Sequence, residues 1–164
     1  MDATELGRLI DNHGGALVLY ARQWSAAPED VVQDALLALM AQVRTPEPVV
    51  PWLFRVVRNR AISAARSERR RRRREASAAP QPWFHLELAT GLEAAELRDA
   101  LAALPLEQRE VIVAHLWGGL TFEQVGQLSG CSTSMAYRRF GEGVAKLRER
   151  MGGVSCPTKP PTRK

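Results

Sequence analysis

The chain has 164 residues, of which 45% are hydrophobic and 25% are charged. That length fits one or two small domains, and the balance excludes a wholly disordered chain because enough apolar residues are present to form a core. The two cysteines lack the spacing of metal ligands, and we find no signal peptide or membrane-spanning stretch, so we expect a cytoplasmic protein without metal, cofactor or membrane insertion.

The first half of the chain predicts helices separated by glycine and proline. Apolar residues between positions 6 and 24 recur at helical spacing, with a break expected at Gly14-Gly15. A second helix is expected to begin at Pro28, and the prolines of Thr45–Pro51 predict a loop after it. A further helix is predicted from Trp52 onward. The expected apolar stripe of the second helix consists of Val32, Leu36, Leu39, Met40 and Val43.

The positive charge is concentrated in the helix that follows this loop. Between Arg55 and Arg74 there are ten arginines and a single acid, Glu68, whereas residues 84–130 carry seven acids and two bases. Six of the arginines form the uninterrupted run 69–74. Cations gathered in one segment indicate contact with a polyanion such as nucleic acid. We expect the run to extend the helix and to fray toward its end.

The second half predicts a separate helical domain. The stretch "ASAAPQPWF" has the alanine, serine and proline content of a linker. Helices are expected on both sides of Pro105, and the second is expected to close at Gly118-Gly119. The predicted fold is therefore all-α, with two small helical domains joined by a flexible linker. The expected boundaries are 1–75 for the first domain, 76–92 for the linker, 93–151 for the second domain and 152–164 for a C-terminal tail.

Residues 121–150 have the pattern of a helix-turn-helix. Thr121 and Gln124 predict a capping box, and Gly130 suits the turn before the second helix. Hydroxyl and guanidinium groups on one face of that second helix suit the phosphates and base edges of a major groove. There are two alternatives. The segment could be an ordinary helical hairpin with two solvated arginines, or the arginines could contact phosphates alone. The candidate DNA contacts are Ser132, Thr133, Ser134, Tyr137, Arg138 and Arg139.

Two segments together resemble a known family. The stretches "PEDVVQDALLALM" and "WLFRVVRN" are similar to region 2 of bacterial RNA polymerase sigma factors, and "GLTFEQVGQLSG" is similar to region 4. Their order and spacing resemble the extracytoplasmic-function (ECF) group of the sigma-70 family. The resemblance implies a promoter-specificity subunit and not an enzyme. Its implied partners are the clamp and flap of core RNA polymerase and promoter DNA, both duplex and melted. An anti-sigma factor is a further partner that the family allows.

The resemblance also implies roles for residues of the first domain. The second helix would dock on the polymerase clamp, and the basic helix would capture melted −10 DNA with Trp52 and Phe54 as aromatic faces. Core packing is the alternative for Trp52. In the family, a loop over the flipped base begins at the position of Asn59. The implied polymerase contacts are Asp30, Val31, Gln33, Asp34 and Leu37. The implied −10 contacts are Trp52, Arg55, Arg58, Asn59, Arg60, Ser63, Arg66, Arg69, Arg70 and Arg73.

The candidate recognition helix departs from the family pattern. Met135 and Tyr137 stand where polar contacts are common, so the resemblance implies a −35 preference that differs from familiar members. Gly141 and Gly143 each cost about 1 kcal/mol of helix propensity relative to alanine. We therefore expect tertiary packing, more than propensity, to hold this helix.

Three other functions fit parts of the pattern. A helix-turn-helix regulator acting without core polymerase would bind duplex DNA with no preference for forked DNA. A small recombinase would need a nucleophile, for which Ser25 and Ser63 qualify only by residue type because neither has a plausible set of partners. An interaction protein that sequesters an anti-sigma factor would not create new transcription start sites.

Overall fold

The computed structural model describes residues 2–75 and 92–151, with the backbone but not the side chains of 72–75 and 92–95. Every regular element in these ranges is helical, which confirms the all-α prediction. The chain divides into two compact units, Met1–His85 and Leu86–Lys164. The predicted linker and C-terminal tail lie outside the described residues, except for Leu92, which is the first residue of a helix.

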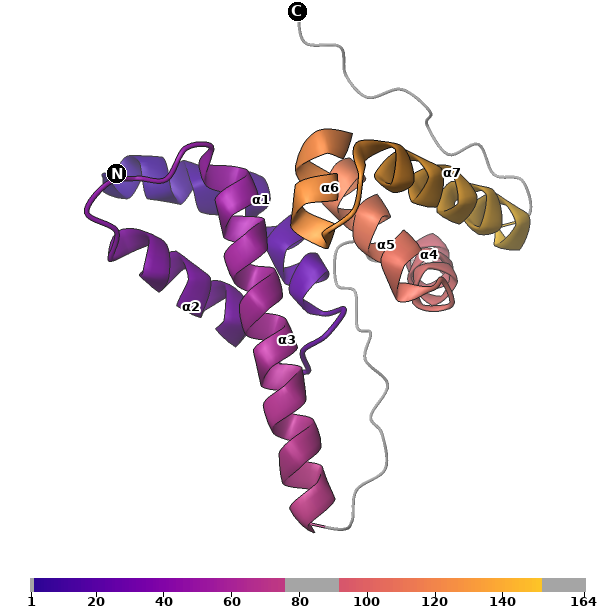
Figure 1. The fold of residues 1–164 in the computed structure, drawn as a ribbon, viewed down its shortest axis with the longest axis horizontal. Helices are drawn as coiled ribbons and strands as arrows, with labels where there is room; N and C mark the ends of the chain where they lie inside the picture. Colours follow the sequence, from indigo (N-terminus) through magenta and orange to yellow (C-terminus); the bar gives the residue numbers. More distant parts are fainter. Residues whose placement is uncertain (1, 76–91, 152–164) are drawn as a thin grey trace, which may run out of the picture. The chain divides into compact units, whose positions relative to one another are not determined.

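Residues 2–75 of the first unit form a bundle of three helices that all contact one another (Figure 1). They are α1 (Ala3–Ala21), α2 (Pro28–Met40) and α3 (Val49–Glu75). Tyr20 and Phe54 are fully buried at the centre, with ring centroids 5.0 Å apart in an edge-to-face arrangement. Phe54 therefore belongs to the core, and the expectation that it offers an aromatic face to DNA is wrong.

The expected break at Gly14-Gly15 is absent, because α1 continues through both glycines. Two interior glycines cost about 2 kcal/mol of helix propensity relative to alanine. Burial of Leu17, Leu19 and Tyr20 in the last turns of α1 offsets this cost, since each large apolar side chain contributes about 1.5–3 kcal/mol. Tertiary packing thus overrides the local preference.

The start of α2 is confirmed, with Pro28 in its first turn, but the predicted apolar stripe is only partly buried. Val32 and Leu39 lie in the core, whereas Met40 is 52% exposed and Val43 is fully exposed. The helix ends at Met40, so Val43 no longer follows helical spacing. The predicted stripe is therefore wrong at Val43, which lies beyond the helix, and it is not buried at Met40.

Helix α3 begins three residues earlier than expected, at Val49 instead of Trp52. Pro51 lies in its first turn, where a missing N–H breaks no helical hydrogen bond. The helix also continues through Asn59, so the loop that the resemblance implies at that residue is absent. Its C-terminal end at Glu75 confirms that the arginine run extends the helix. Leu53, Val57 and Ala61 form its fully buried stripe together with Phe54.

Within residues 92–151, the second unit has four α-helices and one π-helical segment, and Figure 1 shows the α-helices. They are α4 (Leu92–Ala102), α5 (Leu106–Ile112), η1 (Val113–Trp117), α6 (Phe122–Ser129) and α7 (Thr133–Arg150). Pro105 separates α4 from α5 as predicted, and Gly119 closes the second helix with a φ of 69°. The last turn widens into the π form, in which the Gly118 amide donates to the Val113 carbonyl at 3.1 Å. The sequence did not predict this widening.

Helices α5 and α7 approach closely at Gly143. A Cβ atom at this position would lie 2.6 Å from Cδ1 of Ile112 and 3.2 Å from Cβ of Gln108. At Gly141, by contrast, an added Cβ would meet nothing within 4 Å. The two glycines therefore differ in their surroundings, because only a side chain at Gly143 would meet close neighbours on α5.

We predict opposite effects for Gly141→Ala and Gly143→Ala. The first should raise the unfolding free energy of the second unit by about 1 kcal/mol through helix propensity. The second gains the same propensity but forces apart Ile112, which is fully buried, and Gln108, so we expect a net loss of about 1 kcal/mol or more. Hydrogen exchange of the α5 and α7 amides measures both changes. Equal effects of the two substitutions would contradict the close approach.

An ion pair joins the end of α1 to the first turn of α2. Arg22 Nη2 donates to Glu29 Oε1 at 2.8 Å, and the Arg22 side chain is 14% exposed. This hydrogen bond is the main reason why the pKa of Glu29 lies below its ordinary value of 4.5. The folded first unit is therefore stabilised by the ionised carboxylate.

The pair predicts a pH dependence for the stability of the first unit. Because the folded-state pKa of Glu29 is depressed, its contribution is complete above pH ~4.5 and is lost as pH falls through the folded-state pKa. Glu29→Gln should lower the unfolding free energy by about 0.5–1 kcal/mol at pH ~7 and have little effect at pH ~2. Urea unfolding followed by NMR signals of α1–α3 measures the difference. An equal loss at both pH values would exclude this role for the charge.

Candidate nucleic-acid interface

The turn between α6 and α7 has the geometry of a helix-turn-helix. The Thr121 hydroxyl accepts a hydrogen bond from the Gln124 amide at 3.2 Å, and the Gln124 side chain accepts from the Thr121 amide at 2.9 Å, which confirms the capping box. Gly130 ends α6 with a φ of 68°. At Gly126, a Cβ atom would lie 2.7 Å from the Cys131 carbonyl oxygen, so the turn can pack against α6 only over a glycine.

The predicted DNA contacts gather at the N-terminal half of α7. The Ser132 hydroxyl accepts from the Met135 amide at 3.2 Å and caps the helix as expected. Arg139 is half-buried, and the other five predicted residues are exposed. Three hydroxyls and a helix N-terminus suit a phosphate, while longer side chains one turn further along suit base edges.

An aromatic cluster packs behind the exposed N-terminal half of α7. The His115 ring stacks on Phe122 with centroids 4.1 Å apart, and Phe140 packs edge-on against both. Tyr137 packs edge-on against Phe122 at 5.2 Å and remains 63% exposed. His115 Nδ1 lies 2.7 Å from the Leu120 carbonyl oxygen, within hydrogen-bonding distance. The sequence did not place His115 in this cluster, because the contact depends on how η1 and α6 pack.

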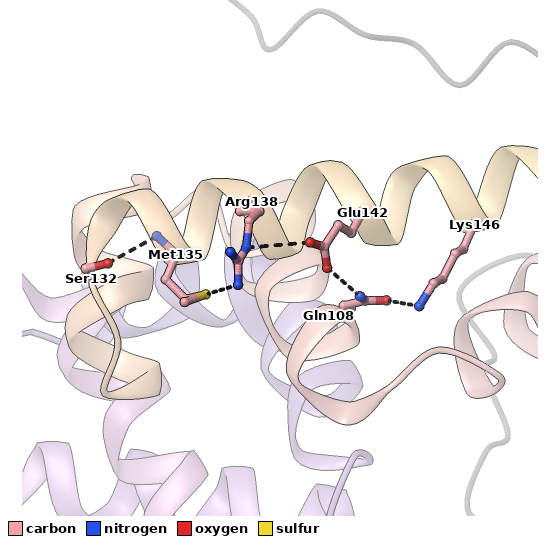
Figure 2. Close-up of polar contacts among 6 residues, drawn as sticks. All are labelled: Gln108, Ser132, Met135, Arg138, Glu142 and Lys146. Carbon is pink, nitrogen blue, oxygen red and sulfur yellow. Dashed lines mark hydrogen bonds and ion pairs between the residues drawn. The ribbon is translucent and has the colours of Figure 1, made fainter.

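Arg138 is held at both ends by other residues of α7 (Figure 2). Its Nη2 donates to the Met135 sulfur at 3.2 Å, and its Nε lies 3.5 Å from Glu142 Oε1. Glu142 Oε2 in turn accepts from Gln108 Nε2 at 3.0 Å. The sequence predicts Arg138 as a DNA contact but does not predict the three residues that position it.

Most of the predicted −10 contacts share one side of α3. Successive residues of a helix are about 100° apart, which places Trp52, Arg55, Asn59 and Ser63 on the side opposite the buried stripe. The four residues are exposed except Trp52, which is half-buried. Arg66, Arg69 and Arg70 continue this side and are exposed. Arg73 lies in α3, but its side chain is outside the described residues.

Arg58 and Arg60 lie at the two edges of the buried stripe and are held by neighbouring elements. The Arg58 guanidinium carbon lies 5.8 Å from the centroid of the Trp24 ring, a cation–π distance. Arg60 Nη1 lies 3.3 Å from Asp34 Oδ2 on α2. Helical spacing places Arg60 away from the other candidate contacts. The sequence alone does not predict the contact of Arg58 with Trp24 or the pairing of Arg60 with Asp34.

Arg71 differs from its neighbours in the arginine run. Its Nε and Nη2 donate to the two carboxylate oxygens of Glu68 at 3.0 and 3.2 Å. Arg69 and Arg70 are exposed on the opposite side of α3. The run therefore presents its cations unequally, with Arg71 turned toward an acid of its own helix.

Four of the five predicted polymerase contacts share an exposed side of α2. Helical spacing places Asp30, Gln33, Asp34 and Leu37 together, and Leu37 is 51% exposed. Val31 is only 7% exposed, so its side chain packs in the domain core and offers almost no surface to a partner. Met40, at the end of α2, is also exposed.

Other classes of site find little support in residues 2–75 and 92–151. No group of three or more histidine, cysteine, aspartate or glutamate side chains is arranged there to hold a metal ion. Among the helices of those ranges, none combines the length and apolar character needed to cross a membrane.

Comparisons with known proteins agree with this arrangement of helices. Residues 9–71 match the family model "Sigma-70 region 2", and residues 94–147 match "Sigma-70, region 4". The chain is 31% identical to the "ECF RNA polymerase sigma factor SigL" of Mycobacterium tuberculosis, with 90% of this chain and 89% of that protein covered. It is also 30% identical to the "Probable RNA polymerase sigma factor RfaY" of Xanthomonas campestris over 88% of this chain, which spans 40% of that protein's length.

A solved structure shares the fold. The sigma factor RpoE of Bartonella quintana, determined in complex with the anti-sigma factor NepR, superposes with a TM-score of 0.72. It is 23% identical, and the match covers 93% of this chain and 97% of that one. Matches to region 2 and region 4 in this order define a sigma-70 type protein, and the chain belongs to the extracytoplasmic-function group of RNA polymerase sigma factors.

Proposed function

We propose that this chain is a promoter-specificity subunit that binds core RNA polymerase and recognises two promoter elements. The observation that supports this most directly is one exposed cationic helix face in each matched region, on α3 and on α7. One such face would suffice for a duplex-binding regulator. Two faces in separate units, matched to regions 2 and 4, fit a protein that contacts DNA at two places.

The first unit is assigned two roles. The exposed side of α2 would dock on the polymerase clamp, since it combines carboxylates, an amide and the apolar Leu37. The exposed side of α3 would hold the melted −10 strand, with arginines on the backbone and Trp52 available to stack on an unpaired base. Asn59 would act from within the helix, because no loop begins at that position.

The second unit would place α7 in the major groove of the −35 element. Its hydroxyl-bearing N-terminus would bind phosphate, while Tyr137 and Arg138 would face base edges. Sigma factors are non-catalytic, and we propose the same for this chain, with the free energy of capturing the unpaired strand offsetting the cost of melting. It would act in the cytoplasm. The structure of Bartonella RpoE in complex with NepR supports an anti-sigma factor as a further partner of this chain.

Reconstitution with bacterial core polymerase tests the proposal. We expect the full chain to co-purify with core enzyme and to direct transcription from a defined set of promoters in a genomic library. Core enzyme alone and core enzyme with heat-denatured chain are the controls. A chain that binds duplex DNA equally well without polymerase, and shows no preference for forked DNA, would instead be a helix-turn-helix regulator.

The arginine run predicts unequal salt effects. Replacing both Arg69 and Arg70 with alanine should weaken promoter binding and reduce the log–log salt slope by about 2, since each neutralised phosphate contributes about 0.9. Arg71→Ala should reduce it by less than about 0.9, because this guanidinium already pairs with Glu68. Filter binding of the holoenzyme across a salt series measures both slopes. Promoter choice should not change, and a shifted promoter set would contradict a backbone role.

A further inference from the structure

The packing of α5 against α7 carries an inference about how DNA sequence is read, and it rests on the proposed contact between α7 and the −35 element. Gly143 lets the two helices come within reach of short side-chain contacts, because a Cβ atom at this position would lie only 3.2 Å from Gln108 Cβ. Gln108 is therefore drawn against α7 and is only 8% exposed. A buried amide must satisfy both its donor and its acceptor, so its partners matter.

Both ends of the Gln108 amide are satisfied by α7 (Figure 2). Nε2 donates to Glu142 Oε2 at 3.0 Å, and Oε1 accepts from Lys146 Nζ at 3.1 Å. A carboxylate on one side and an ammonium on the other permit a single orientation of the amide, because reversing it would face donor to donor and acceptor to acceptor. Gln108 thereby fixes the position of one oxygen of Glu142.

Glu142 then presents its second oxygen toward Arg138. The 3.5 Å separation from Arg138 Nε and the 3.2 Å contact between Nη2 and the Met135 sulfur restrain the guanidinium from both sides. The arginine is 66% exposed even so. Among the described residues, Nη1 contacts no acceptor, so the end of the guanidinium fork is available to a base edge.

The strengths of the two interactions indicate that Glu142 restrains Arg138 without preventing it from binding DNA. An exposed ion pair shifts an equilibrium by about fivefold at most, whereas a bidentate arginine–guanine contact discriminates by about five- to 150-fold. The DNA contact therefore outcompetes Glu142 for Arg138. Restricting the side chain beforehand also reduces the conformational entropy that DNA binding must remove. A carboxylate beside the guanidinium further disfavours a phosphate as its partner, since the two anions repel each other.

We propose that Glu142 and Gln108 are positioning residues that direct Arg138 to a base edge of the −35 element and away from the phosphate backbone. The pair thus sets sequence selectivity, although neither residue needs to touch DNA. Met135 has a supporting role in the same arrangement, because its sulfur holds the other side of the guanidinium.

The test compares Glu142→Gln with Glu149→Gln in the polymerase holoenzyme. Glu149 is exposed on the same helix, so its substitution changes net charge equally. The probes are the −35 duplex selected from a randomised pool by the wild-type holoenzyme, and a scrambled duplex of the same composition. We expect Glu142→Gln, but not Glu149→Gln, to lower the selected-to-scrambled affinity ratio about threefold or more. Its salt slope on the scrambled duplex should steepen by about 0.9 relative to the control, as Arg138 turns to phosphate.

Two further variants separate positioning from fold and from simple charge repulsion. Gln108→Met keeps the packing volume and net charge, and it should lower the same ratio while the α7 amides stay protected from hydrogen exchange. In the Arg138→Ala background, Glu142→Gln should act no differently from Glu149→Gln. Equal increases in affinity for both duplexes with Glu142→Gln would show that Glu142 only repels phosphate, which would overturn the inference.

The outcome also distinguishes this inference from the proposed function. A wild-type holoenzyme that selects no upstream duplex at all would contradict the assignment of α7 to the −35 element. Selection that is normal in the wild type and unchanged by Glu142→Gln and Gln108→Met would leave that assignment intact and refute the positioning role alone.

Discussion

Burial of an apolar stripe beneath each cationic helix is the interaction on which the rest of this structure depends. Helix α3 carries ten arginines, whose mutual repulsion opposes helix formation. Its N-terminal half buries Leu53, Phe54 and Val57 completely, and each contributes about 1.5–3 kcal/mol. Repulsion between exposed neighbours is several times smaller per pair. The charged half of α3 is thus held by its apolar half, which leaves the exposed side to cations.

In the second unit, tertiary packing again holds the cationic helix, but the contact that does so is different. Helix α7 carries two glycines and has little propensity of its own, so its contact with α5 and α6 must hold it. Gly143 makes the contact with α5 close, and the closeness brings Gln108 between Glu142 and Lys146. The close packing of α5 on α7 and the positioning of these polar side chains therefore both depend on Gly143. A residue that weakens the helix locally is the residue that lets a buried amide orient an exposed arginine.

In the first unit, charged residues at the edges of the core also contact side chains of neighbouring elements. Arg58 lies over Trp24, and Arg60 pairs with Asp34, so both cations are restrained by neighbouring elements. Asp34 belongs to the side of α2 proposed to meet the polymerase, and Arg60 to the set proposed for DNA. The ion pair thus joins the two proposed surfaces. Because both groups are largely exposed, the pair is weak enough to exchange for either partner.

The sequence by itself determined the helical class, the two matched regions, the caps at Thr121 and Ser132, and the exposed residues of α7, because these depend on local spacing and local hydrogen bonds. The tertiary structure decided the features that local helix propensity does not determine. It carried α1 through Gly14-Gly15, because burial outweighs local preference. It also kept α3 helical through Asn59 and placed Phe54 in the core, where the family resemblance had implied a loop and an aromatic face for DNA. It also distinguished Gly141 from Gly143, whose local costs are equal, and it alone brought Gln108 to Glu142 across 34 residues of chain.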